Sequence, residues 1–82
     1  MQATITYNGI CDGGNHVFLT VTIGGKSRSM TVLKNDILTD TGYEVLNEDQ
    51  AVLRELRKYL KRQGITTWSA ARSAFNNLPL EI

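Results

Sequence analysis

Hydrophobic and polar residues alternate in the first third of the chain, and this pattern predicts an antiparallel sheet. In residues 16–23, HVFLTVTI, every second residue is apolar, and the same period of two appears in residues 3–7, ATITY. Gly24 and Gly25 then stand where a two-residue hairpin turn needs residues that tolerate positive φ. We therefore expect a three-stranded antiparallel β-meander over about residues 3–7, 16–23 and 26–33.

The hairpin turn also sets the register of the two strands that it joins. With the turn at 24–25, Ile23 faces Lys26 and Val17 faces Val32, so alternate residues of both strands share one face. That face is apolar except at its tip, where the basic residues of the second strand begin. The opposite face collects hydroxyl side chains: Thr20, Thr22, Ser27, Ser29 and Thr31.

The hydrophobic period lengthens to helical spacing in the second half of the chain. In residues 48–63, EDQAVLRELRKYLKRQ, apolar residues recur on one side of a helix. Asn47 precedes this run in the N-cap position, and Gly64 follows it where a left-handed residue ends a helix. A second helix is expected over about residues 68–77, WSAARSAFNN, with Thr67 as its cap.

The remaining segments complete the predicted fold. Residues 34–46 predict a helical turn and a packed loop. At the C-terminus, Leu78, Leu80 and Ile82 predict a strand-like segment packed on the core in preference to an apolar hook for another subunit. The predicted fold is α+β in a single domain, residues 1–82, with the β-meander followed by an α-helical hairpin.

Charge is unevenly distributed along the 82 residues, although the formal net charge is only +1. Residues 1–53 carry three basic and six acidic side chains, a balance of 3 − 6 = −3, whereas residues 54–82 carry six and two, a balance of 6 − 2 = +4. A domain this short builds a small core, so it gains stability from self-association or from a larger partner. A homodimer is therefore one expectation.

The positive charge concentrates on the outer side of the first long helix, opposite its apolar stripe. At about 100° per residue the basic side chains of this helix fall within one arc. We take these residues, together with Arg72 of the second helix, as the candidate partner-binding set: Arg54, Arg57, Lys58, Lys61 and Arg62. Lys26 and Arg28, at the tip of the predicted hairpin, are secondary candidates.

Two patterns raise the question of nucleotide binding or catalysis. The GGKS run at 24–27 resembles the end of a P-loop, GxxxxGK[ST], but the first glycine of that motif would fall on Thr20 and a strand follows in place of a helix. The four serines occupy no GxSxG context, and His16 is the only imidazole in the chain. We therefore expect a simple hairpin turn, no catalytic residues and no enzyme activity.

Residues 8–15, NGICDGGN, predict an exposed loop because they are rich in Gly, Asn and Asp. Cys11 and Asp12 in this loop, with His16 beyond it, are residue types that bind metals. A structural zinc site needs four protein ligands and a catalytic site usually three, yet the chain has one Cys and one His. We expect no metal and no cofactor, with a site shared across a dimer as the remaining alternative.

The helical half carries a further pattern. Residues 53–75, LRELRKYLKRQGITTWSAARSAF, resemble the first two helices of helix-turn-helix DNA-binding domains, with Gly64 as the turn glycine, Ile65 as the apolar residue after it and 70–72 as the small, packed part of the next helix. Residues 76–82 are too short for the recognition helix that should follow. If residues 68–77 were instead the recognition helix itself, its outward side chains, which would contact DNA, would be Ser69, Arg72, Ser73 and Asn76.

No basic and apolar leader opens the sequence, no apolar run approaches the roughly 18 residues of a membrane span, and a single cysteine makes no intramolecular disulfide. We expect an intracellular, cytoplasmic protein that does not enter a membrane.

The function expected from these features is that of a non-catalytic protein-interaction module with a protein partner. Its build is similar in style to the small accessory proteins that phages and other mobile elements use to inhibit host machinery. The alternative is a small DNA-binding regulator, which would use the basic helix for phosphates and a dimer for paired half-sites. A third alternative is a subunit of a larger assembly that pairs through its sheet edges.

Overall fold

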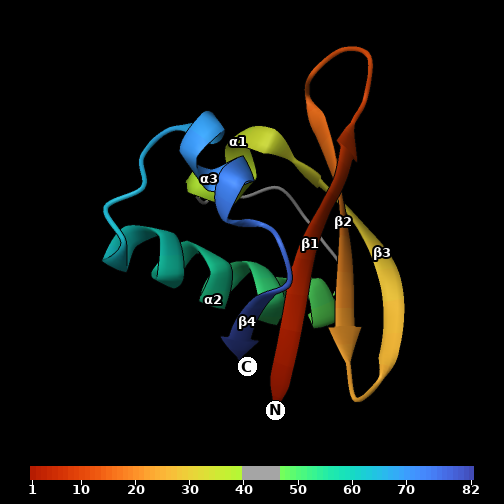
Figure 1. Ribbon diagram of the computed structural model, residues 1–82. Coiled ribbons are helices and arrows are strands. Elements are labelled where there is room, and N and C mark those ends of the chain that lie inside the picture. The colour runs from red at the N-terminus through yellow and green to blue at the C-terminus, as the bar shows by residue number, and fades with distance from the viewer. Residues whose placement is uncertain (40–46) are drawn as a thin grey trace.

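Residues 1–39 and 47–82, which the computed structural model describes, form a four-stranded antiparallel sheet with three helices on one of its faces (Figure 1). Side chains of the second range are described from residue 49 onward. The strand order is β3-β2-β1-β4, and the predicted α+β class is confirmed. The elements are β1 (Gln2–Ile10), β2 (His16–Ile23), β3 (Lys26–Leu33), α1 (Lys34–Leu38), α2 (Asn47–Arg62), α3 (Trp68–Ala74) and β4 (Leu78–Glu81).

The hairpin of β2 and β3 forms in the predicted register. Gly24 and Gly25 have φ values of 61° and 80°, the positive values of a two-residue turn that follows the twist of its strands. Ile23 pairs with Lys26, and the pairing continues in step to the far end of both strands. The side chains of this register that face the helices are buried in the core: Val17, Leu19, Val21, Met30 and Val32.

Strand β1 continues beyond the end that the sequence predicts for it. Its register with β2 shifts between Tyr7 and Gly9, which marks a β-bulge, and pairing then resumes as far as Ile10. The exposed loop therefore spans residues 11–15, and the prediction of a loop over 8–15 is wrong for its first three residues. Asn8 and Gly9, which contributed to the prediction of a loop, lie at this bulge.

The prediction of a three-stranded sheet is wrong, because the C-terminal segment adds β4 to the free edge of β1. Leu78 pairs with Ile5 and Leu80 with Ala3, and both leucines are buried. Pro79 has no N–H to donate, and an edge strand accommodates it. The predicted strand-like packing of the C-terminus is confirmed, and its consequence is a sheet with one more strand.

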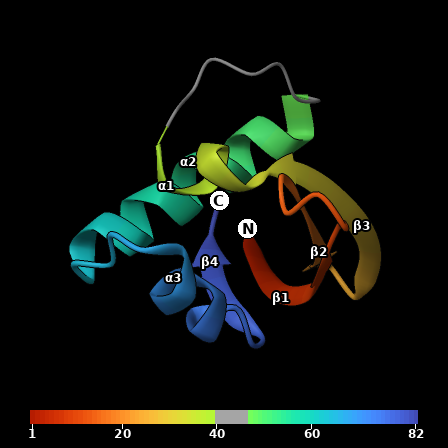
Figure 2. The same ribbon diagram turned by 90° about the horizontal axis from the view of Figure 1, so that it is seen from above.

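Helix α2 covers the apolar face of the sheet and runs across it (Figures 1 and 2). The predicted helix, 48–63, is observed at Asn47–Arg62. Its apolar stripe is confirmed, because four of its side chains are at most 2% exposed: Val52, Leu53, Leu56 and Leu60. The opposite side of the same helix faces outward.

Helix α2 ends in a Schellman motif. Gly64 has a φ of 70°, the Ile65 N–H donates to the Leu60 carbonyl at 2.9 Å, and the Gly64 N–H donates to the Lys61 carbonyl at 3.1 Å. This pair of hydrogen bonds turns the chain back on the helix. Ile65 therefore returns toward Leu60, which is the hydrophobic contact that commonly accompanies the motif.

Helix α3 does not form the second arm of the predicted helical hairpin. Thr67 caps it as predicted, with its hydroxyl accepting the Ala70 N–H at 3.4 Å, but the helix ends at Ala74 instead of residue 77. It packs on β1, where the Tyr7 N–H donates to the Phe75 carbonyl at 2.9 Å. This hydrogen bond and the contact between the Trp68 and Tyr7 rings hold α3 against β1, so α3 lies near the end of the sheet and not along α2 (Figures 1 and 2).

The helical turn predicted within residues 34–46 is observed as α1, with Ile37 buried in the core. The packed loop predicted for the rest of that segment lies outside the described residues from position 40 onward. The side chain of Asn47, predicted to cap α2, also lies outside them.

We predict that Gly64→Ala lowers the free energy of unfolding by about 1–2 kcal/mol, because Ala disfavours the left-handed conformation of this position. A Cβ at Gly64 meets no atom within 4 Å, so the cost comes from the backbone alone. Urea denaturation measures it. Gly13→Ala is the control, because its φ is not in the left-handed region and its Cβ makes only an ordinary contact. Equal stability of the two variants would contradict the assignment of the motif.

Candidate functional site

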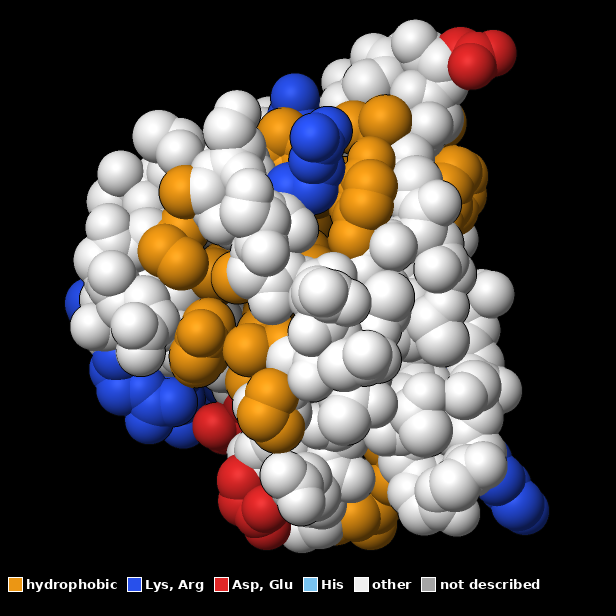
Figure 3. All heavy atoms as spheres, viewed as in Figure 1, with side chains coloured by type: hydrophobic (Ala, Val, Ile, Leu, Met, Phe, Trp, Pro, Cys, Tyr) orange, Lys and Arg blue, Asp and Glu red, His pale blue; other side chains and the backbone are white. Residues whose placement is uncertain are grey.

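Four basic side chains of α2 form an exposed positive surface, which we name the basic face: Arg54, Lys58, Lys61 and Arg62. Lys58 lies 3.3 Å from Glu55 in an exposed pair, which contributes little to stability. Within the described part of the chain, the other three side chains of the basic face take part in no ion pair. Lys and Arg side chains gather over this part of α2 at the lower left of Figure 3.

Arg57 was predicted to belong to this surface, but it faces inward. Its Nη2 lies 3.1 Å from Asp36 Oδ2, and its Nε donates to the Asp36 carbonyl at 2.8 Å. The Asp36 side chain is 1% exposed and that of Arg57 is 22% exposed. A carboxylate buried this deeply needs a cation and hydrogen bonds to offset its lost hydration. Arg57 therefore ties α2 to α1.

Arg28 was predicted at an open hairpin tip, and it too is engaged. It lies opposite Val21 on the helix-facing side of the sheet, and its Nη2 is 2.5 Å from Oδ1 of Asp49 in the first turn of α2. The Asp49 side chain is 9% exposed. This ion pair joins β3 to α2, while Lys26 remains exposed at the tip.

Arg72 lies on α3, away from the α2 surface. Its guanidinium carbon is 5.6 Å from the centroid of the Tyr7 ring, a cation–π distance. Trp68 completes this corner, with ring centroids 5.9 Å from Tyr7 and 6.2 Å from Phe75. The structure therefore does not bring Arg72 together with the basic face.

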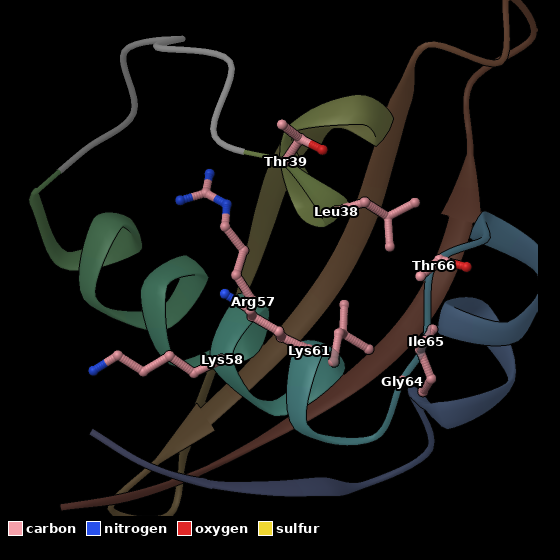
Figure 4. Close-up of a pocket in the computed structure, with 9 residues that line it drawn as sticks. Leu38, Thr39, Arg57, Lys58, Lys61, Gly64, Ile65 and Thr66 are labelled. Atoms are coloured by element: carbon pink, nitrogen blue, oxygen red, sulfur yellow. The ribbon is translucent and has the colours of Figure 1, made fainter.

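A cleft of about 410 Å³ opens beside the basic face, between α1, the C-terminal half of α2 and the link to α3 (Figure 4). Its apolar walls are Leu38, Leu60 and Ile65. Figure 4 shows Arg57 extending toward α1 and Lys58 pointing outward. The other residues at its borders are Thr39, Lys61, Gly64 and Thr66.

Sequence reasoning missed this cleft and both buried aspartates. Gly64 followed by Ile65 was a usable signal, because a Schellman motif returns the residue after the glycine toward the helix. The register that turned Arg28 inward was a second signal, because an inward arginine requires an acidic partner. Nothing in the sequence placed Leu38 opposite Ile65.

The loop at residues 11–15 holds Cys11 close to the start of β2. The His16 N–H donates to Cys11 Sγ at 3.3 Å, and the Cys11 N–H donates to the His16 carbonyl at 2.9 Å. Hydrogen bonds from the backbone of His16, and then of Asn15, stabilise the thiolate and lower the pKa of Cys11 to about 7. The described residues contain no cluster of three or more His, Cys, Asp or Glu side chains that could hold a metal ion.

The sheet face opposite the helices carries the predicted hydroxyl residues. The hydroxyls of Thr22 and Ser27 share a hydrogen bond at 2.7 Å, and the Asn8 amide donates to the Thr20 hydroxyl. Helices α1 to α3 all lie on the other side of the sheet (Figure 2). These cross-strand hydrogen bonds give the hydroxyl groups a structural role.

We predict that Arg57→Gln lowers the free energy of unfolding by about 1–3 kcal/mol, because it leaves the buried Asp36 carboxylate without its cation. Arg54→Gln, the same change at an exposed position of the same helix, should stay within about 0.5 kcal/mol of the wild type. Guanidinium denaturation of both variants measures the difference. Equal, small effects would show that Arg57 belongs to the solvated surface.

We predict that alkylation of Cys11 by iodoacetamide in the native protein follows a pH profile with its midpoint at about 7. The thiolate is the reacting form, so the rate rises as pH increases through this value and levels off above it. The unfolded chain in denaturant is the control, with a midpoint near the ordinary cysteine value of about 8.5. Coincident native and denatured profiles would contradict the role of the backbone donors.

Comparison of the chain with protein-family models, with curated proteins and with solved structures found no match. No helix in residues 1–39 and 47–82 is long and apolar enough to cross a membrane. The site is therefore interpreted from its own geometry, and the helix-turn-helix resemblance stays a prediction.

Proposed function

We propose that this protein is a non-catalytic interaction module that docks the basic face of α2 on an acidic surface of a larger protein. The observation that carries this proposal is the division of α2 into two sides. One side is buried against the sheet, while Arg54, Lys61 and Arg62 stand exposed on the other with no ion pair inside the described part of the chain. Positive charge gathered in this way favours encounter with an acidic partner.

The alternative, a DNA-binding regulator, has less support from the same geometry. Arg57 is engaged with Asp36, and Arg72 lies over the Tyr7 ring, so two of the residues predicted to contact phosphate or bases have other partners. Helix α3 has only seven residues, a short element for reading a groove. The apolar cleft beside the basic face also offers a contact that a phosphate backbone cannot use, whereas a protein can.

The proposed role is that of an accessory protein, which binds a larger machine and inhibits it. A small domain whose interaction surface lies on one helix can cover a site on a partner without any chemistry of its own. The style of the sequence, similar to small phage and mobile-element proteins, agrees with this role.

The test compares two variants of equal net charge. Arg54→Gln, Lys58→Gln and Arg62→Gln together remove three of the four positive charges of the basic face and give the neutralised variant. Lys26→Glu with Thr31→Glu changes the far end and outer face of the sheet and gives the sheet variant. Each lowers the formal net charge from +1 to 1 − 3 = −2. Proteins captured from cell extracts are quantified for the wild type and both variants, and a labelled random duplex is titrated by fluorescence anisotropy at low and physiological salt.

We expect that at least one protein is captured in equal amounts by the wild type and the sheet variant, and that the neutralised variant does not capture it. Identical capture by the wild type and both variants would show that the basic face is not the docking surface. Duplex binding that falls with salt at a slope of about −0.9 per phosphate contact, and that the neutralised variant loses, would establish the DNA-binding alternative instead.

A further inference from the structure

The cleft beside α2 and the basic face form one composite surface. Leu38, Leu60 and Ile65 give the cleft apolar walls, and Lys58 and Lys61 stand at its border (Figure 4). Among the residues that the structure describes, nine line this cleft and none of the nine is acidic. A ligand that fills this surface therefore presents an apolar group to the walls and negative charge to the lysines.

The positive charge that a ligand in the cleft could contact comes from Lys58 and Lys61 and not from Arg57. The guanidinium of Arg57 is held by the Asp36 carboxylate and carbonyl, at 3.1 Å and 2.8 Å, so its charge is offset within the protein. Lys61 and the neighbouring Arg62 have no ion pair within residues 1–39 and 47–82. A negatively charged group beside the cleft would meet Lys61 and Arg62 without displacing an internal partner, and at Lys58 it would compete only with the exposed pair to Glu55.

The volume of the cleft limits what enters it. At about 410 Å³ it lies near the lower end of the roughly 300–1,000 Å³ of small-molecule sites, so it has room for one large side chain and the peptide backbone beside it. The Schellman motif fixes Ile65 close to Leu60, because both hydrogen bonds of the motif hold that turn of the chain. Two of the three apolar walls, Leu60 and Ile65, are thus held in place by the backbone before any ligand arrives.

We propose that the cleft receives one aliphatic side chain of an acidic peptide segment, whose carboxylates contact Lys58 and Lys61. This inference rests on the proposed docking function and names its partner class. Charge complementarity selects an acidic ligand, and the apolar walls select a peptide, because an aliphatic residue between acidic ones supplies both groups at the spacing of a chain. A nucleic acid supplies the charge, but its backbone brings no aliphatic side chain.

The probe is a displayed library of random short peptides, from which binders are selected on the folded protein and synthesised with a fluorescent label. We expect the selected peptides to carry Asp or Glu around one Leu, Ile or Met. Thr66→Trp places a large side chain at the border of the cleft without changing its charge, and it should weaken binding by about tenfold or more. Thr31→Trp, the same substitution on the outer sheet face, is the control and should bind as the wild type does.

A double-mutant cycle tests whether the aliphatic residue occupies the cleft. Replacing that residue of the peptide by Ala should weaken binding to the wild type about as much as Thr66→Trp does. The same peptide change should weaken binding to the Thr66→Trp variant little further. Lys58→Gln with Lys61→Gln should weaken binding by a factor that shrinks as salt increases, whereas Lys26→Gln should not. Circular dichroism of all variants confirms that the fold is retained.

Failure of this inference is distinguishable from failure of the docking function. In one outcome, the selected acidic peptides show no aliphatic preference and bind Thr66→Trp at full strength, but do not bind the lysine variant. This result would contradict an aliphatic side chain in the cleft and would leave the basic face as the docking surface. Neutral or basic peptides, or binding that neither variant changes, would overturn both.

Discussion

Burial of the apolar stripe of α2 against the sheet is the interaction on which the rest of the structure depends. The hairpin and β1 present an apolar face that another layer must cover, and α2 supplies four side chains at most 2% exposed. This packing carries a cost, because it buries two carboxylates, Asp36 and Asp49. Arg57 and Arg28 offset that cost, and the two ion pairs join α2 to α1 and to β3.

Helix α2 contributes both to the core, through its apolar side chains, and to the surface, through its exposed basic side chains. Residues 54, 58 and 62 repeat at i,i+4 spacing, where like charges repel and destabilise a helix by roughly 0.2–0.5 kcal/mol per pair. Positive charge that the fold does not need, present at this cost, is the observation behind the binding surface that we propose. The end of the same helix shapes the cleft, because Gly64 returns Ile65 to Leu60. The buried side of α2 and the proposed docking surface are therefore two sides of one element.

The sequence predicts the parts whose pattern is local. The period of two, the Gly24-Gly25 turn, the stripe of α2 and the Thr67 cap are all confirmed, because each depends on residues close together in the chain. The fourth strand, the position of α3 and the inward direction of Arg57 depend on partners far away in sequence. Pairing of Leu80 with Ala3, or of Arg57 with Asp36, follows from tertiary packing that periodicity does not report.

The most direct test of this division of α2 is the stability of the variant that neutralises Arg54, Lys58 and Arg62 with glutamine, measured by urea denaturation at low and high salt. We predict a free energy of unfolding within about 1 kcal/mol of the wild type, because relieved repulsion offsets the lost surface pairs and helix-dipole interactions. The remaining difference should shrink as salt is added. A loss of several kcal/mol would show that these side chains maintain the fold, and would contradict their assignment as a surface kept for a partner.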